Sequence, residues 1–189
     1  MDRKRDKKQE KKQVRKKKGS PVAVLCSTLG TVILVGLVVL CLPLTVPRVL
    51  GFEIYTVVSG SMEPAIPTGS LAYVQGAQPE EIEEGDVIAF YGGRESTAII
   101  THRVAENNTL EGEFTTKGDA NEKEDVSPVP YRELIGEVAY TIPTLGWAAQ
   151  TLTSTWGKAS AAAAIGGALV LHLLGAWIRN HREKKEEAQ

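Results

Sequence analysis

The chain has 189 residues, and its 22 Lys and Arg residues nearly balance its 23 Asp and Glu residues, leaving a net charge of −1. This length has room for one modest domain besides membrane anchors. The sequence contains no Gly-rich phosphate loop, no metal-ligand spacing and no aromatic-basic surface pattern, so nucleotide, zinc and nucleic-acid functions lack support.

The first 20 residues form a strongly basic segment. Residues 1–20 carry eleven Lys and Arg against three Asp and Glu. Such a segment attracts any polyanion, so a nucleic-acid-binding tail is an alternative. Its position directly before a long apolar stretch instead favours a cytoplasmic tail beside a membrane.

Residues 21–47 are predicted to form a first transmembrane helix, since residues 19–47 contain no charged side chain. Residues 22–42 alone would span about 31 Å, at about 1.5 Å per residue. The alternative is a cleavable signal peptide, whose apolar region is usually about 7–15 residues long. The greater length here favours an uncleaved anchor.

A second uncharged stretch covers residues 159–178, with Trp156 and Trp177 near its ends. Aromatic rings favour the membrane interface, so this stretch is predicted to be a second transmembrane helix. Its small residues would allow close helix packing. They include Gly166, Gly167 and Gly175.

The distribution of Lys and Arg predicts the topology. Basic residues before the first span and in the segment 179–189 place both termini in the cytoplasm by the positive-inside tendency. Residues 48–158 then form an extracytoplasmic domain. It contains no cysteine, because Cys26 and Cys41 both lie in the first span, so disulfides do not stabilise it.

The outer domain shows the period-two alternation and β-branched residues that are typical of strands. The stretches are residues 52–58, 70–74, 86–91, 98–104, 109–116 and 134–142. Turn residues separate them, at Gly92-Gly93, Asn107-Asn108, Gly118-Asp119 and Ser127-Pro128. We therefore predict a mainly β protein: a small antiparallel sheet or barrel, with one short helix or turn at residues 79–84, flanked by two transmembrane helices.

Ser61 is the candidate nucleophile, in the run Ser59-Gly60-Ser61-Met62-Glu63-Pro64 shortly after the first span. A serine hydroxyl needs a neighbouring base at neutral pH. His102 is the only histidine in the outer domain, since the other two, His172 and His181, lie in the second span and the C-terminal tail. The segment 118–125 supplies carboxylates that could orient an imidazole. A serine-lysine dyad is the alternative, with Lys117, Lys123 or Lys158 as the base.

Together these motifs resemble the type I signal peptidases, and within them the archaeal and endoplasmic-reticulum type. The resemblance covers about residues 22–147. Its carriers are the Ser61 run, Gly85-Asp86-Val87-Ile88-Ala89-Phe90, His102-Arg103-Val104, Thr116-Lys117-Gly118-Asp119 with Asn121 and Asp125, and Ile142-Pro143 with Leu145-Gly146. The bacterial branch uses a lysine base, whereas His102 here matches the histidine of the other branch.

The resemblance implies a role for each matching residue. Ser61 matches the nucleophile, His102 the general base and Asp125 the acid that orients the imidazole. Asp119 matches a second acidic position. Ser59, with the backbone N–H of Ser61, matches the oxyanion-binding position. Ala120 and Glu124 depart from the commonest form of this loop.

The expected function is that of a membrane-bound serine endopeptidase that removes signal peptides from exported preproteins after small residues. The resemblance implies neither a metal nor an organic cofactor. The expected partners are preproteins and the lipid bilayer, with a membrane-protein complex or a nearby translocon left open. The location would be a prokaryotic plasma membrane or the endoplasmic reticulum membrane. The alternative function is a non-catalytic, membrane-anchored β domain that binds or scaffolds exported proteins.

Overall fold

The structure is a computed structural model that describes residues 21–93 and 97–187. The predicted basic tail of residues 1–20 lies outside the described residues. The chain divides into two compact units. Residues 41–158 form a β unit, and the described residues before 41 and after 158 form a helical unit.

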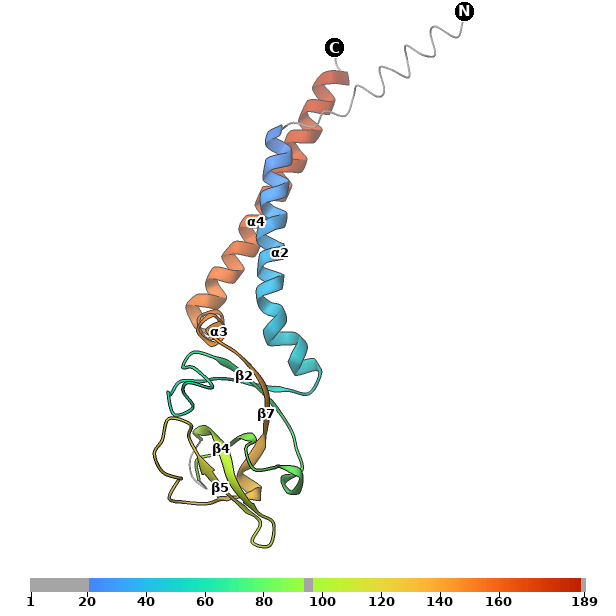
Figure 1. Cartoon of the computed structure of the whole chain (residues 1–189). Helices are drawn as coiled ribbons and strands as arrows, with labels where there is room; N and C mark the ends of the chain where they lie inside the picture. The colour runs from blue at the N-terminus through green and yellow to red at the C-terminus, as the bar shows by residue number, and fades with distance from the viewer. Residues whose placement is uncertain (1–20, 94–96, 188–189) are drawn as a thin grey trace, which may run out of the picture. The chain divides into compact units, whose positions relative to one another are not determined.

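The β unit contains one antiparallel sheet of seven strands, curled into a half-barrel (Figure 1). The strand order is β1-β2-β7-β3-β4-β5-β6. The strands are β1 (Glu53–Thr56), β2 (Leu71–Gln75), β3 (Val87–Tyr91), β4 (Ile99–Asn108), β5 (Glu113–Lys117), β6 (Val129–Pro130) and β7 (Leu134–Ile142), with 3-10 turns at Pro79–Glu81 and Tyr131–Glu133. The mainly β fold predicted from the alternation is therefore confirmed.

Strand β4 is longer than the sequence predicts. It continues through Asn107 and Asn108, where a turn was expected. The Asn107 amide donates to the carbonyls of Pro79 and Ile82 at 2.9 and 2.8 Å, so its side chain holds the strand end against a neighbouring segment. The chain turns just afterwards, where Gly112 adopts a φ of 72°.

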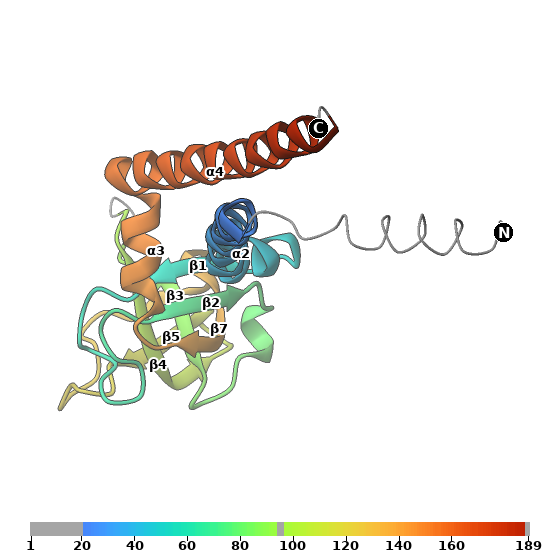
Figure 2. The ribbon, with the colours of Figure 1, turned by 90° about the horizontal axis from the view of Figure 1, so that it is seen from above.

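A short helix, α3 (Leu145–Thr153), follows β7. It lies within residues 48–158, for which the sequence predicts mainly β structure, and it was not predicted. It packs against β1 and β2, as the view from above shows (Figure 2). The helix approaches closely because of Gly146, where a Cβ atom would lie 2.6 Å from the carbonyl oxygen of Ser70. These nine residues are too few to show the helical period of apolar residues clearly, so the sequence does not reveal the helix.

The main hydrophobic core of the β unit lies where β3, β4 and β5 face the connecting segments. Its buried members are Ile82, Ile88, Phe90, Val104, Phe114 and Val129. Val104 of β4 pairs in register with Thr116 of β5, and both are buried. His102 lies two residues before Val104 on the same strand face. The core therefore anchors the strand positions from which the candidate site is built.

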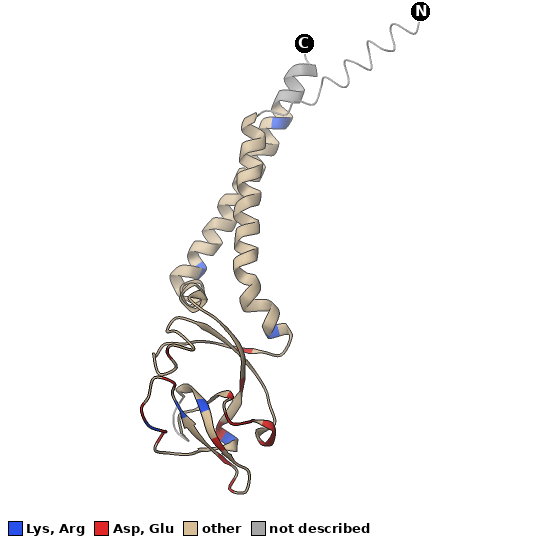
Figure 3. Ribbon diagram, in the orientation of Figure 1, with Lys and Arg blue, Asp and Glu red and all other residues tan. Residues whose placement is uncertain are grey.

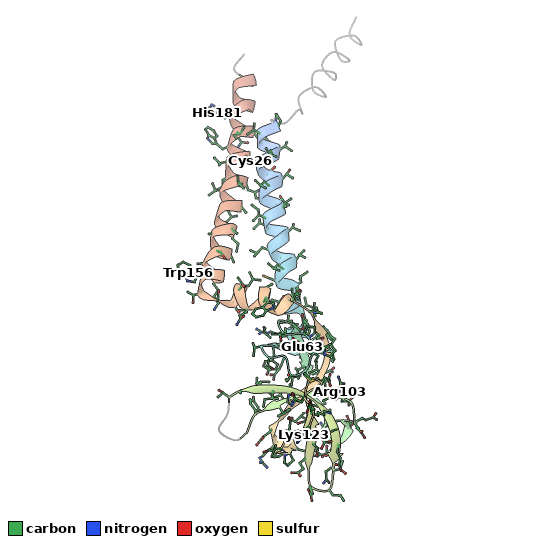
Figure 4. The ribbon with its side chains drawn as sticks, turned by 60° about the vertical axis from the view of Figure 1, so that its left-hand side comes forward. Cys26, Glu63, Arg103, Lys123, Trp156 and His181 are labelled. Carbon is green, nitrogen blue, oxygen red and sulfur yellow. The ribbon has the colours of Figure 1, made fainter. Side chains whose placement is uncertain are left out.

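The helical unit is formed by most of α2 (Pro21–Val49) and α4 (Thr155–Glu187). Both helices are long and apolar enough to cross a membrane, judged by length and composition. Among the described residues, Asp and Glu are concentrated on the β unit, while the helices are nearly free of charged residues between their ends (Figure 3). Trp156 and His181 lie near the two ends of α4 (Figure 4).

The two helices approach each other at glycines, but only partly at those predicted. A Cβ atom on Gly30 would lie 3.0 Å from the Ala168 carbonyl oxygen, and one on Gly175 would lie 3.0 Å from the Ala23 carbonyl oxygen. Gly166 and Gly167 face open space. The prediction of close packing thus holds for Gly175 and is wrong for the other two, because they lie on another face of α4.

Candidate active site

Ser61 lies in a tight turn between β1 and β2. The turn is closed by hydrogen bonds from the Ile66 N–H to the Met62 carbonyl, at 2.8 Å, and from the Glu63 N–H to the Gly60 carbonyl, at 3.0 Å. The Met62 side chain is only 1% exposed and packs below the turn. Ser61 itself stays half-buried, and its Oγ lies 3.4 Å from the Oγ of Ser59.

A groove of about 170 Å³ runs beside Ser61. Its walls come from β1 with the residues after it, from the Ser61 turn and from the start of β4. Apolar side chains dominate the lining, which includes Val57, Val58, Met62, Ile66, Ile99 and Ile100. Such a lining can accept apolar groups beside Ser61.

His102 is held on β4 with one ring nitrogen committed to a carboxylate. The residue is 8% exposed, and its Nδ1 lies 2.5 Å from Oδ2 of Asp125. An ionised carboxylate only accepts hydrogen bonds, so the proton of this contact belongs to Nδ1, and in the neutral imidazole Nε2 is then an acceptor. The ring of Phe90 packs edge-on against the imidazole, with centroids 6.3 Å apart. Together these contacts determine the orientation of the ring.

The second ring nitrogen of His102 lies close to the Ser61 turn, with Gly118 between them. A Cβ atom on Gly118 would lie 3.0 Å from Nε2 of His102 and 2.6 Å from the carbonyl oxygen of Ser61. The Ala120 N–H donates to that same carbonyl at 2.9 Å. The fold therefore brings the segment after β5, the Ser61 turn and the Nε2 nitrogen of His102 to one place.

Asp119 does not contact the imidazole. Its two carboxylate oxygens accept hydrogen bonds from Nε and Nη2 of Arg103, at 2.8 and 2.6 Å, and Arg103 Nη1 also donates to the Gly85 carbonyl at 2.6 Å. The hydrogen bond to Asp119 raises the pKa of Arg103 above its ordinary value. Asp119 thus connects its loop to β4, whereas Asp125 is the acid beside His102.

The lysines considered as alternative bases lie elsewhere. On β5, Phe114 and Thr116 are buried, whereas Lys117 points to the opposite face and pairs in register with Arg103. His102 shares the face of Thr116, so Lys117 is on the wrong side of the sheet. Lys123 is exposed in the loop that follows, and Lys158 lies in the first turn of α4.

Two contacts of the site were not predicted from the sequence. One is the hydrogen bond from the Thr116 hydroxyl to Asp125, and the other is the Arg103–Asp119 ion pair. The buried position of Thr116 on an alternating strand is the signal that could have revealed the first. Residues 21–93 and 97–187 bring together no group of three or more side chains that could hold a metal ion.

The site thus holds a serine hydroxyl, an imidazole near the turn of that serine and a partly buried carboxylate in contact with the imidazole. These three groups are the chemical components of a serine hydrolase. No protein-family model matches the chain. Over 87 residues it is 40% identical to signal peptidase I W of Bacillus subtilis (strain 168), covering 44% of each chain. Over 76 residues it is 38% identical to the signal peptidase complex catalytic subunit SEC11C of Homo sapiens and of Mus musculus, covering 38% of each.

The chain thus spans less than half the length of the curated relatives it matches. Within that part, the relatives confirm the resemblance to type I signal peptidases that the motifs indicate. The two apolar helices and these relatives together indicate association with a membrane.

Proposed function

We propose that the chain is a membrane-bound serine endopeptidase that cleaves signal peptides from exported preproteins. The observation that carries the proposal is the 2.5 Å contact between His102 and Asp125, with the second imidazole nitrogen beside the Ser61 turn. The names of the relatives support the class of substrate.

In the proposed reaction, Ser61 Oγ attacks the carbonyl carbon of the scissile peptide bond while His102 Nε2 takes the hydroxyl proton. Asp125 holds the Nδ1 proton and stabilises the imidazolium. The imidazolium then returns its proton to the leaving amine, and the acyl group stays on Ser61. Water, activated by the same imidazole, releases the acyl group and restores the serine.

The negative oxygen that forms during the attack needs donors on the other side of the carbonyl. The Ser61 backbone N–H and the Ser59 hydroxyl are the proposed donors, because the two serine Oγ atoms lie 3.4 Å apart. Removing one such donor typically lowers kcat by about 10²–10³. Ser59→Ala should therefore weaken catalysis without abolishing it.

Cleavage after small residues is proposed from the resemblance. The walls of the groove beside Ser61 are mostly apolar, which agrees with short apolar side chains at that place. The substrate's own apolar segment would remain in the bilayer while the two anchors hold the peptidase at the same surface.

The proposed topology puts both termini in the cytoplasm and residues 48–158 outside. The Lys and Arg residues before residue 21 and after residue 178 support this orientation, and the two long apolar helices support two spans. The membrane is either a prokaryotic plasma membrane or that of the endoplasmic reticulum. A membrane-protein complex or a nearby translocon is a further proposed partner.

Reconstitution in lipid vesicles with a preprotein tests the proposal. Ser61→Ala and His102→Ala should abolish cleavage, and Asp125→Asn should lower kcat by about 10⁴, because the imidazole would lose its orienting carboxylate. Asp119→Asn should lower thermal stability more than the rate of the chemical step, since Asp119 contacts Arg103 and not His102. Single-turnover cleavage and thermal unfolding measure the two effects.

Lys117→Ala is the matched control for the base and should retain full activity. Complete processing by Ser61→Ala would remove the proposed function. A harmless Asp125→Asn change together with an essential Asp119 would instead overturn the assignment of the acid.

A further inference from the structure

Thr116 is a fully buried polar residue next to the candidate site. Its exposed fraction is 0%, and it lies on β5 opposite Val104 of β4. Its hydroxyl is shut off from water, so its hydrogen bonds must be made within the protein. A buried threonine beside an apolar core is costly unless its hydroxyl is satisfied.

That hydroxyl is satisfied by Asp125. Thr116 Oγ1 donates to Asp125 Oδ2 at 2.7 Å, which is the same oxygen that receives the proton on His102 Nδ1 at 2.5 Å. The backbone repeats the connection, because the Asp125 N–H donates to the Thr116 carbonyl at 2.8 Å. Asp125 is thus joined to β5 through one residue, by both its main chain and its side chain.

Asp125 needs such a connection because it lies in a segment without helix or strand, between β5 and β6. Its side chain is 26% exposed, so water competes for the carboxylate. Strand β4 carries the imidazole and β5 carries Thr116, and the two strands are paired at fixed register. The hydrogen bond from the Thr116 hydroxyl therefore holds the Asp125 carboxylate at a set position relative to the His102 imidazole.

We infer that Thr116 is a positioning residue for the proposed peptidase, which holds the Asp125 carboxylate where it orients the His102 imidazole. This inference rests on the proposed function. Thr116 touches neither substrate nor reacting atoms, and acts only through Asp125. In the proposed reaction the Asp125 carboxylate does not bind substrate. Loss of the Thr116 hydroxyl should therefore lower kcat and leave KM unchanged.

Two substitutions separate the hydroxyl from the packing. Thr116→Val keeps the shape and removes the donor, and Thr116→Ser keeps the donor and removes a methyl group. For cleavage of a preprotein in vesicles, Thr116→Val should lower kcat about 10- to 100-fold with KM unchanged, the range for one hydrogen bond to a charged group. Thr116→Ser should keep most of the wild-type kcat.

A double-mutant cycle shows whether Thr116 acts through Asp125. In an Asp125→Ala background, Thr116→Val should cause no further loss of single-turnover rate. If Thr116 merely supported the fold, Thr116→Val would lower the single-turnover rate by the same factor in both backgrounds. Equal losses in both, or equal losses for Thr116→Val and Thr116→Ser, would overturn the inference.

Thermal unfolding of each variant checks that it is folded. If Thr116→Val does not fold, the comparison of Thr116→Ala with Thr116→Ser makes the same test. Ser61→Ala distinguishes a failure of the proposed function from a failure of the inference about Thr116. Cleavage that persists in Ser61→Ala removes the proposed function and this inference with it, whereas Ser61-dependent cleavage at the wild-type rate in Thr116→Val removes this inference alone.

Discussion

Gly118 lies where the Ser61 turn, the His102 ring and the segment after β5 meet. A Cβ atom there would be 2.6 Å from the Ser61 carbonyl oxygen, 2.8 Å from Nδ2 of Asn121 and 3.0 Å from Nε2 of His102. The first of these contacts is with backbone, which cannot simply rotate away. Only glycine therefore fits between these groups.

Gly118→Ala should strongly reduce cleavage and lower the stability of the β unit by about 1–3 kcal/mol, the usual cost of overpacking. Gly76→Ala is the matched control, since nothing lies within 4 Å of a Cβ atom at that position. Preprotein cleavage and thermal unfolding of both variants measure the effects. Equal activity of Gly118→Ala and Gly76→Ala would contradict the close approach of His102 to the Ser61 turn.

At this scale the motifs nominated the catalytic residues but not Thr116, and the resemblance assigned Asp125 as the acid that orients the imidazole. Asp119 and Asp125 are both acids of one loop, and without the resemblance the sequence left either able to reach the imidazole. Asp119 is paired with Arg103, the residue after His102. The Arg103 side chain points to the opposite face of β4 from the His102 side chain. Because side chains alternate between the two faces of β4, Asp119 meets Arg103 on one face and Asp125 meets His102 on the other.

The turn that carries Ser61 depends on Glu63. The Glu63 carboxylate accepts hydrogen bonds from the hydroxyl and the N–H of Thr68, at 2.8 and 3.2 Å, and these lower the pKa of Glu63 below its ordinary value of 4.5. Because folding favours the charged carboxylate, its contribution to stability is present above the unfolded pKa. It is lost as the pH falls through the lower folded pKa.

Wild type should therefore be more stable than Glu63→Gln at neutral pH, and the difference should shrink as the pH falls below 4.5. Thermal unfolding of both proteins over a series of pH values measures it. A difference that stays constant down to strongly acid pH would show that the charge of Glu63 does not stabilise the turn.

The contact between α2 and α4 depends on Gly30. A Cβ atom there would lie 3.0 Å from both the Ala168 carbonyl oxygen and Cδ2 of His172, and His172 Nε2 lies 3.5 Å from Thr31 Oγ1. Small residues allow helix backbones to approach closely in a bilayer. His172, the histidine of the second span, thus packs against α2 at Gly30 and Thr31.

Gly30→Leu should separate the two helices and lower the thermal stability of the helical unit in detergent. Gly36→Leu is the matched control on the same helix, because nothing lies within 4 Å of a Cβ atom at Gly36. Circular dichroism on heating compares the two variants, which share the gain in helix propensity. If Gly36→Leu were as harmful as Gly30→Leu, the contact at Gly30 would not hold the helices together.

At the scale of the whole molecule, the proposed topology predicts which positions can be labelled from outside a cell. Val126 is fully exposed in the β unit. With Cys26 and Cys41 replaced by serine, Val126→Cys should react with a membrane-impermeant maleimide in intact bacterial cells, whereas Ala188→Cys should react only after lysis. The reverse pattern of labelling would put the β unit in the cytoplasm.

The sequence by itself determined the two apolar helices, the mainly β unit and the residues nominated for the site. These follow from local properties: uncharged runs, alternation along strands and short motifs. The tertiary structure shows which acid contacts His102, which glycines bring the helices together, and that Thr116 and Gly118 lie beside the proposed catalytic residues. Those outcomes depend on strand register, on the turns between strands and on backbone approach between distant segments, and none of these is encoded in a local pattern.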